Sequence, residues 1–228
     1  MTDLVQAWRH VLDKLGTAAK ALQRDPSSIR LLAVSKTFPL ADIQTLFAAG
    51  QHAFGENYAK ELQEKATVLP QAEWHFIGPL QSNKTRIVAK YADWVHSVDR
   101  PSILQRLSIQ RPAYLPDLNI CLAVNVRDAI SKNGVLPEAL RCLAETALQY
   151  HNLRLRGLMC IAEATSDALK LRAQFFTLYR LFDELNQTGF ALDTLSMGMT
   201  NDLDIAIAAG ANMVRVGTAI FGARKVKS

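Results

Sequence analysis

The stretch Leu31-Leu32-Ala33-Val34-Ser35-Lys36-Thr37 is an apolar, strand-like run that ends in an ammonium group. The turn after it reads Ser35-Lys36-Thr37-Phe38-Pro39. An open, doubly wound nucleotide-binding sheet would carry a glycine-rich G-x-G-x-x-G turn at this point. The sequence of this turn therefore favours a closed barrel over the open sheet, which is its main competitor.

Short apolar runs alternate with helical patterns along the whole chain. The predicted strands cover 31–35, 52–54, 74–77, 94–98, 119–126, 155–160, 193–196 and 212–216. The predicted helices cover about 3–23, 39–49, 57–67, 81–90, 100–108, 136–149, 168–187 and 201–208. This alternation implies a parallel sheet, and eight strand units predict an α/β fold, a (β/α)8 TIM barrel with an extra N-terminal helix. We expect residues 1–228 to form one domain, because such barrels commonly have about 200–250 residues.

The composition is that of a soluble globular protein, with 49% hydrophobic and 21% charged residues. We expect a cytoplasmic location, because no apolar run approaches the roughly 18 residues that span a bilayer. The N-terminus also carries charged side chains where a signal peptide would be apolar. The three cysteines, Cys121, Cys142 and Cys160, are widely spaced and are expected to be reduced thiols.

Charge and histidine content exclude some partners. The net charge of +5 does not predict nucleic-acid binding, because the chain has no basic cluster with interleaved aromatic residues. A phosphorylated small molecule accounts equally well for a few placed cations. The five histidines lack metal-ligand spacing, so no metal is expected. We expect no membrane partner, and we expect a monomer because a complete barrel leaves no unpaired strand edge.

Lys36 is the first candidate for chemistry. At the rim of a buried strand an amine loses hydration, which lowers its pKa and leaves more of the neutral form that condenses with aldehydes. The alternative is a lysine whose ammonium simply reaches out of the strand end into solvent. In barrels the active site lies at the C-terminal ends of the strands, which is where Lys36 stands.

Glycine and hydroxyl residues gather after the last two strands, in Ser196-Met197-Gly198-Met199-Thr200-Asn201 and Arg215-Val216-Gly217-Thr218. Barrels commonly bind phosphate at this place. Strand periodicity points Arg215 into the barrel, where a guanidinium needs an acceptor. A structural carboxylate such as Asp193 is the alternative partner to a ligand. Lysine, phosphate cup and inward arginine together suit pyridoxal 5′-phosphate.

Longer motifs point to a known family. The chain resembles the YggS/PROSC family of pyridoxal 5′-phosphate-binding proteins, also called pyridoxal phosphate homeostasis proteins, almost end to end. The motifs that carry the resemblance are Ala33-Val34-Ser35-Lys36-Thr37, Phe54-Gly55-Glu56-Asn57-Tyr58, Trp74 to Lys84, His96-Ser97-Val98-Asp99-Arg100, Gly157-Leu158-Met159, Leu195-Ser196-Met197-Gly198-Met199, Met213-Val214-Arg215 and Gly222-Ala223-Arg224.

The resemblance implies a barrel like the N-terminal domain of alanine racemases, with pyridoxal 5′-phosphate held as a Schiff base, an internal aldimine, on Lys36. By matching motif, Asn57 would lie beside the cofactor and Arg215 would face its pyridine nitrogen. His75 is a weaker candidate for the ring environment, and a core histidine is its alternative role. The phosphate cup would be formed by Ser196, Thr200, the backbone around Met199, Gly217 and Thr218.

Two loops depart from the family pattern. After the fifth strand the chain keeps Lys132 and Gly134 but has Ala129 where the family carries an acidic residue. After the sixth strand the usual proline-containing M-A-I-P is Met159-Cys160-Ile161-Ala162. The roles of these two loops, and of Lys132 in particular, do not follow from the resemblance.

The sequence favours a carrier over an enzyme. An arginine opposite the pyridine nitrogen keeps that nitrogen unprotonated and weakens the ring as an electron sink. The first hypothesis is therefore a protein that stores, buffers or delivers the cofactor to apo-enzymes, with no catalytic residues. A weak racemase or transaminase that uses Lys36, with Tyr58 or His75 as a second acid or base, is the alternative. A lysine aldolase acting on a sugar phosphate is a third possibility.

Overall fold

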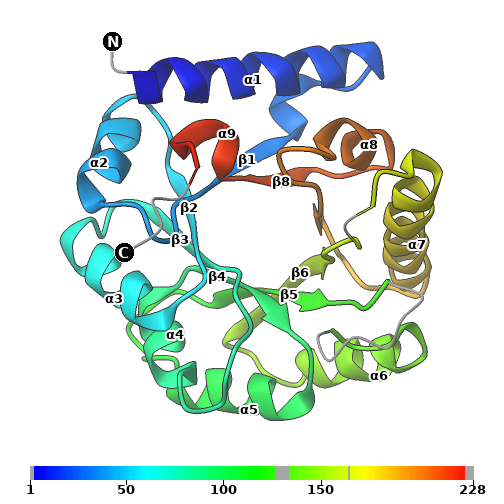
Figure 1. The fold of residues 1–228 in the computed structure, drawn as a ribbon. Helices are drawn as coiled ribbons and strands as arrows, with labels where there is room; N and C mark the ends of the chain where they lie inside the picture. Colours follow the sequence, from blue (N-terminus) through cyan, green and yellow to red (C-terminus); the bar gives the residue numbers. More distant parts are fainter. Residues whose placement is uncertain (1–2, 127–133, 164, 224–228) are drawn as a thin grey trace.

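The computed structural model describes residues 3–126, 134–163 and 165–223. Within these ranges eight parallel strands pair in chain order, and β8 closes the barrel against β1 (Figure 1). The predicted fold class, a (β/α)8 barrel with an extra N-terminal helix, is confirmed. The strands are β1 (Arg30–Val34), β2 (Ala53–Glu56), β3 (Glu73–Phe76), β4 (Trp94–Val98), β5 (Leu118–Ala123), β6 (Leu153–Met159), β7 (Thr194–Ser196) and β8 (Met213–Val216).

Helices follow the strands and form the outer ring of the barrel (Figure 1). Prolines at the first position of two of them, Pro101 and Pro137, suit a helix start because that position has no intrahelical N–H bond to lose. The helices are α1 (Asp3–Ala21), α2 (Leu40–Ala48), α3 (Ala59–Val68), α4 (Thr85–Tyr91), α5 (Pro101–Gln110), α6 (Pro137–Ala147), α7 (Ala168–Gln187), α8 (Leu203–Ala208) and α9 (Thr218–Phe221), with the short 3-10 helix η1 (Pro26–Ser28).

The sequence did not predict η1 or α9. Helix α9 has only four residues and covers little of the barrel wall outside β8. Helix α1 lies across this part of the molecule and contacts α9, α2 and α8 (Figure 1). Its apolar face buries Val5, Trp8, Val11, Leu15 and Ala19, so the extra N-terminal helix completes the outer layer.

Two apolar layers hold the barrel together. The larger one fills the space between the strands and the helices. The smaller one lies inside the barrel and includes Leu32, Trp94, Cys121 and Met213. Side chains on a strand alternate between these two layers, so Arg215 shares the inward face with Met213, as its spacing predicts.

Membrane spans and metal clusters are both absent from the described residues. No helix of the described chain is both long and apolar enough to cross a bilayer. Among the same residues, no group of three or more His, Cys, Asp or Glu side chains is arranged to hold a metal ion.

Candidate functional site

A cavity of about 440 Å³ opens at the C-terminal ends of the strands. Residues that follow β1, β2, β6, β7 and β8 meet there, as the barrel geometry requires. Seven of the nine predicted site residues line it. These seven are Lys36, Asn57, Met199, Thr200, Arg215, Gly217 and Thr218.

The turn that carries Lys36 is fixed on both sides. Lys36 is the second residue after β1 and is partly buried. The next residue, Thr37, has φ 68°, which is unusual for a residue with a side chain. Its backbone N–H donates to Glu61 Oε2 at 2.7 Å, and Lys65 Nζ donates to the Ser35 carbonyl at 2.9 Å. Helix α3 therefore holds the backbone on either side of the lysine.

A buried carboxyl group, that of Glu56, lies behind this turn. Ser35 Oγ donates to Glu56 Oε1 at 2.6 Å, while Oε2 has no hydrogen-bond partner. Burial raises the pKa of Glu56 to about 7, although the neighbouring ammonium of Lys65 opposes the shift. The support of the Lys36 turn therefore contains a group that can titrate near neutral pH.

Asn57 follows β2 and presents an amide to the cavity wall. Its Oδ1 is buried and has no hydrogen-bond partner. The loop after β3 packs against its backbone at Gly78, where an added Cβ would collide with Asn57 Cα and its carbonyl oxygen. Burying an amide oxygen without a donor costs free energy, so this orientation of the Asn57 amide is held at a cost.

Arg215 is 5% exposed and points into the barrel from β8. Its Nη1 donates to Ser196 O at 2.6 Å and to Ser196 Oγ at 2.8 Å, and its Nη2 donates to Cys160 O at 2.8 Å. Burial lowers the pKa of Arg215, but an arginine begins so high that it stays charged. The alternative prediction, that Arg215 pairs with Asp193, is wrong, because the Asp193 carboxylate pairs with Arg156 at 2.6 Å.

Two predicted residues, Ser196 and His75, do not line the cavity. Ser196 is fully buried below the cavity, and its hydroxyl lies between His96 Nδ1 and Arg215 Nη1. This is not the position expected for a side chain that contacts phosphate. His75 is also fully buried, and its ring nitrogens meet Glu73 and His96. It lies in the core, as the alternative prediction for it states.

The loop after β7 is shaped by Gly198, which has φ 90°, a conformation that favours glycine. A Cβ there would lie 2.5 Å from Ala206 Cβ on α8. The backbone N–H of Met199 donates to Asp202 Oδ1. This N–H, expected in the phosphate cup, therefore already has an acceptor within the loop, while Thr200 and Thr218 line the cavity.

Sequence reasoning missed one wall of the cavity. It is formed by the loop after β6 and the start of α7, and it includes Ile161, Glu163, Thr165 and Leu171. The rule that strand ends build the site would have found this wall if it had been applied to the sixth strand as to the others. Lys132 lies outside the described residues.

Comparisons with known proteins agree with this geometry. The profile of the alanine racemase N-terminal domain matches residues 7–225. The pyridoxal phosphate homeostasis protein of Pseudomonas aeruginosa is 51% identical over 226 residues, which cover 98% of this chain and 97% of that protein.

Two solved structures share the fold. PipY of Synechococcus elongatus, solved with PLP bound, has a TM-score of 0.80 and 36% identity, and covers 91% of this chain and 100% of its own. A structure described as an unknown protein from Bifidobacterium adolescentis has a TM-score of 0.90 and 31% identity, and the match covers 97% of each chain.

Proposed function

This chain belongs to the pyridoxal phosphate homeostasis proteins of the alanine racemase N-terminal domain family, and on that basis we propose that its cavity binds pyridoxal 5′-phosphate. The PLP-bound relative PipY supports the choice of ligand. The single observation that carries the proposal is that Lys36, Asn57 and Arg215 line one cavity at the strand ends.

Each group in the cavity has a matching part on the cofactor. The guanidinium of Arg215 would donate to the pyridine nitrogen, and the amide of Asn57 would form a hydrogen bond with the ligand. Thr200 and Thr218 would offer hydroxyls to the phosphate, and Gly217 lets the backbone before α9 approach it closely.

Lys36 would supply the covalent attachment as a Schiff base. The cofactor would bring the aldehyde, and the amine of Lys36 would be the group on the protein that holds it. The turn that carries this amine is held by Glu61 and Lys65 on α3, which limits the positions that its nitrogen can take. Bound pyridoxal phosphate supplies an electron sink, which a cation beside the pyridine nitrogen weakens.

We further propose that the protein stores, buffers or delivers the cofactor and does not turn over amino acids. Among the described residues that line the cavity, the acidic side chains are already engaged: Glu163 pairs with Lys170 at 2.9 Å and Asp202 accepts from Met199 N. His75 is buried elsewhere, and Tyr58 is 55% exposed and does not line the cavity. A racemase needs a second acid or base opposite the lysine, and neither candidate stands there.

The test of binding is the visible absorption of the purified protein before and after borohydride, followed by peptide mass mapping. We expect an absorption band that reduction removes, with the pyridoxyl mass on Lys36 and none in Lys36→Ala. The matched control is Lys90→Ala, which removes a lysine from α4 outside the cavity and should leave the band unchanged. A protein that stays colourless with added cofactor would refute the proposal.

The carrier role has its own test. Loaded protein is mixed with a cofactor-free pyridoxal phosphate enzyme, and recovery of that enzyme's activity is compared with the same amount of free cofactor. We expect delivery without exchange of the α-hydrogen of alanine or serine in deuterated water. Exchange that exceeds free cofactor and disappears in Lys36→Ala would instead favour the weak racemase or transaminase.

We also propose that the protein acts as a cytoplasmic monomer, since the paired strands of the described barrel form a closed ring without a free edge. Sedimentation of the loaded protein over a range of concentrations tests the oligomeric state. A mass near 25.2 kDa at all concentrations is the expected result.

A further inference from the structure

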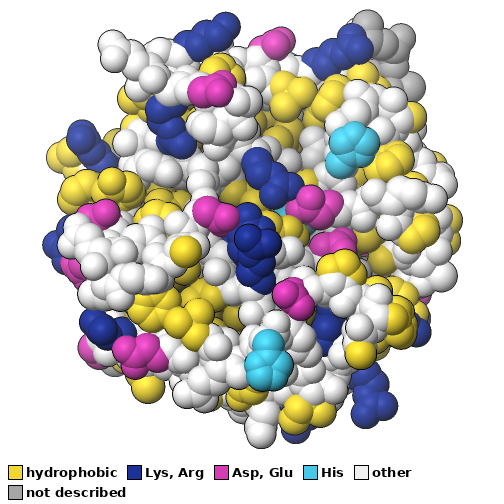
Figure 2. All heavy atoms as spheres, turned by 180° about the vertical axis from the view of Figure 1, so that it is seen from behind, with side chains coloured by type: hydrophobic (Ala, Val, Ile, Leu, Met, Phe, Trp, Pro, Cys, Tyr) yellow, Lys and Arg dark blue, Asp and Glu magenta, His cyan; other side chains and the backbone are white. Residues whose placement is uncertain are grey.

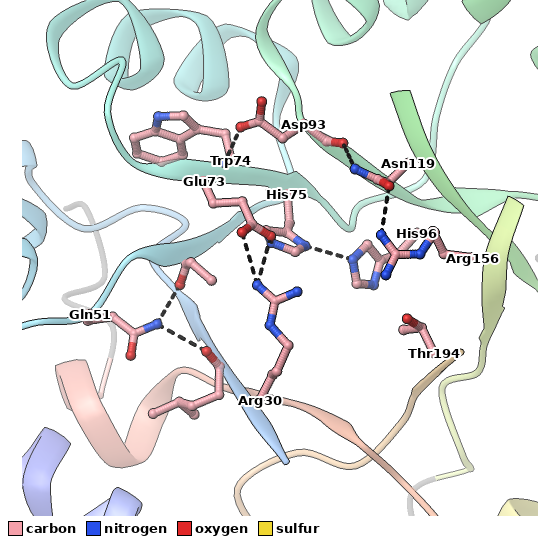
Figure 3. Close-up of polar contacts among 12 residues, drawn as sticks. Arg30, Gln51, Glu73, Trp74, His75, Asp93, His96, Asn119, Arg156 and Thr194 are labelled. Carbon is pink, nitrogen blue, oxygen red and sulfur yellow. Dashed lines mark hydrogen bonds and ion pairs between the residues drawn. The ribbon is translucent and has the colours of Figure 1, made fainter. Parts of the chain in front are cut away.

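A line of hydrogen bonds crosses the inside of the barrel from the cavity to its opposite mouth. It starts at Arg215, whose Nη1 lies 2.8 Å from Ser196 Oγ, and that oxygen lies 2.8 Å from His96 Nδ1. His96 Nε2 lies 2.9 Å from His75 Nδ1, and His75 Nε2 lies 2.7 Å from Glu73 Oε1 (Figure 3). We call Ser196, His96, His75 and Glu73 the relay.

The two ends of the relay determine where each proton lies. An ionised Glu73 can only accept, so His75 Nε2 carries a proton and, in the neutral ring, His75 Nδ1 is an acceptor. His96 must then donate from Nε2 and accept at Nδ1. The Ser196 hydroxyl donates to that Nδ1 and accepts from Arg215, which can only donate. Every bond therefore donates in the same direction, from the cation to the carboxylate.

Burial favours one arrangement of the protons along the relay. His75, His96 and Ser196 have no exposed surface. Burial lowers the pKa of both histidines, and for His96 the positive charge of Arg215 adds to the effect. The charged groups outside the relay that act on the two rings are Arg30 and Asp93 for His75, and Arg30 and Arg215 for His96. An added proton on His75 would set its Nδ1–H against the Nε2–H of His96, and an added proton on His96 would take away the acceptor of the Ser196 hydroxyl, so the neutral pair is favoured.

The ring of Trp94 fixes His75 from one side, with ring centroids 5.4 Å apart and planes 11° from parallel. Arg156 lies over the same indole at 4.7 Å. Glu73, the last residue of the relay, lines a hollow at the N-terminal mouth of the barrel. Basic and acidic side chains lie close together near the middle of this face (Figure 2). Glu73 pairs there with Arg30 at 2.9 Å and is 33% exposed, so one end of the relay reaches solvent.

We propose that the relay positions Arg215, so that a carboxylate on one mouth of the barrel fixes the guanidinium that faces the ligand on the other. Ser196, His96, His75 and Glu73 are then positioning residues. This role deepens the proposed function and rests on it for the identity of the ligand. The relay itself requires no ligand, which makes it measurable in the empty protein.

The first test is long-range ¹H–¹⁵N NMR of the histidine rings in ligand-free protein. We expect His75 and His96 to be neutral and protonated at Nε2 over about pH 7 to 8, since burial lowers the pKa of both rings below the ordinary value. A proton on Nδ1 of His96, or protonation of either buried ring in this range, would overturn the proposal. Failure of pyridoxal phosphate to bind would not affect this result, so the two failures are distinguishable.

The second test cuts the relay and then restores it. His96→Met removes both ring nitrogens, and we expect it to weaken pyridoxal phosphate binding by about tenfold, the loss typical of a hydrogen bond to a charged group. His96→Gln offers an amide oxygen to Ser196 and an amide N–H to His75, so it should bind within about twofold of the parent. Equal binding by parent, His96→Met and His96→Gln would contradict the positioning role.

A third variant covers the case in which His96→Met does not fold. Glu73→Met removes the acceptor at the partly exposed end, while Asp193→Asn removes a carboxylate at the same mouth that is not in the relay. We expect the His96 ring to lose its single tautomer in Glu73→Met and to keep it in Asp193→Asn. An unchanged His96 in Glu73→Met would overturn the proposal.

Discussion

Lys65 Nζ lies 2.7 Å from Glu56 Oε1, and both groups are buried behind the turn that carries Lys36. The pair joins α3 to the end of β2, and the ammonium also donates to the Ser35 carbonyl. Charges taken out of water are stabilised only when each finds several partners. The ion pair therefore serves to hold the lysine turn in one place.

Removal of the ammonium should be costly. In Lys65→Met the Glu56 carboxylate loses its charged partner, and we expect the free energy of unfolding to fall by about 3 kcal/mol at about pH 8. Urea denaturation followed by circular dichroism measures this change. The matched control is Lys60→Met, because the Lys60–Glu64 pair on the same helix is exposed and spans 3.7 Å. A similar loss in both variants would contradict the assigned role of Lys65.

Glu56 should make stability depend on pH. Its pKa is raised from 4.5 in the unfolded chain to about 7 in the fold, so the folded state keeps the proton longer. The protonated Glu56 contributes its full share to the free energy of unfolding below about pH 4.5, and this share is lost as the pH rises to about 7. Relative to Glu56→Gln, the parent should lose up to about 3 kcal/mol over this range. Parallel stability curves for the two proteins would show that Glu56 does not titrate there.

Gly78→Ala should distort the cavity wall, although Gly78 itself does not line the cavity. The new methyl group would meet the Asn57 backbone and move the amide that lines the cavity, so we expect pyridoxal phosphate affinity to fall by about tenfold. Gly16→Ala is the control, since an added Cβ there has nothing within 4 Å and lies in helix α1. That control should leave binding unchanged and stabilise the helix by up to about 1 kcal/mol. Titration of absorbance gives both affinities.

The phosphate cup can be tested by comparing two ligands. Thr200→Val and Thr218→Val keep the shape of the side chain but remove its hydroxyl. We expect each to weaken pyridoxal 5′-phosphate by about tenfold, the value of a hydrogen bond to a charged group, and to leave the binding of pyridoxal unchanged. Equal losses for both ligands would mean that these threonines shape the cavity without contacting phosphate.

The cysteines should differ in reactivity. Burial raises the pKa of the Cys121 thiol to about 12, and Cys160 is also buried, while Cys142 is exposed on α6. Because the thiolate is the reactive form, iodoacetamide at about pH 8 should label Cys142 alone in the folded protein. Mass mapping gives the labelled positions, and denatured protein, in which all three thiols react, is the control.

Local patterns in the sequence were sufficient for the barrel and for most of the cavity. Alternation of apolar runs gave the strand order, and the period of two along β8 gave the inward direction of Arg215. Helix 168–187 and strand 94–98 have the predicted bounds. These properties depend on neighbouring residues, so a single sequence is enough to predict them.

The partner of a buried polar group depends on residues far along the chain. The Ser196 hydroxyl meets His96, which is 100 positions away, and no local pattern distinguishes that contact from a contact with phosphate. Strand β2 extends to Glu56, beyond the predicted end at residue 54. A carboxyl group suggests a strand end unless its buried partners, Lys65 and Ser35, are known.

Leu32 on β1 lies beside Arg215 on β8, at the seam where the barrel closes. Lys36 stands at the end of the first strand, so the two charged ends of the proposed site belong to opposite sides of that seam. During synthesis the edge of β1 has no neighbour on this side until β8 leaves the ribosome. A molecule that bridges Lys36 and Arg215 would then tie the earliest strand of the nascent barrel to its latest, and the completion of folding would create its binding site.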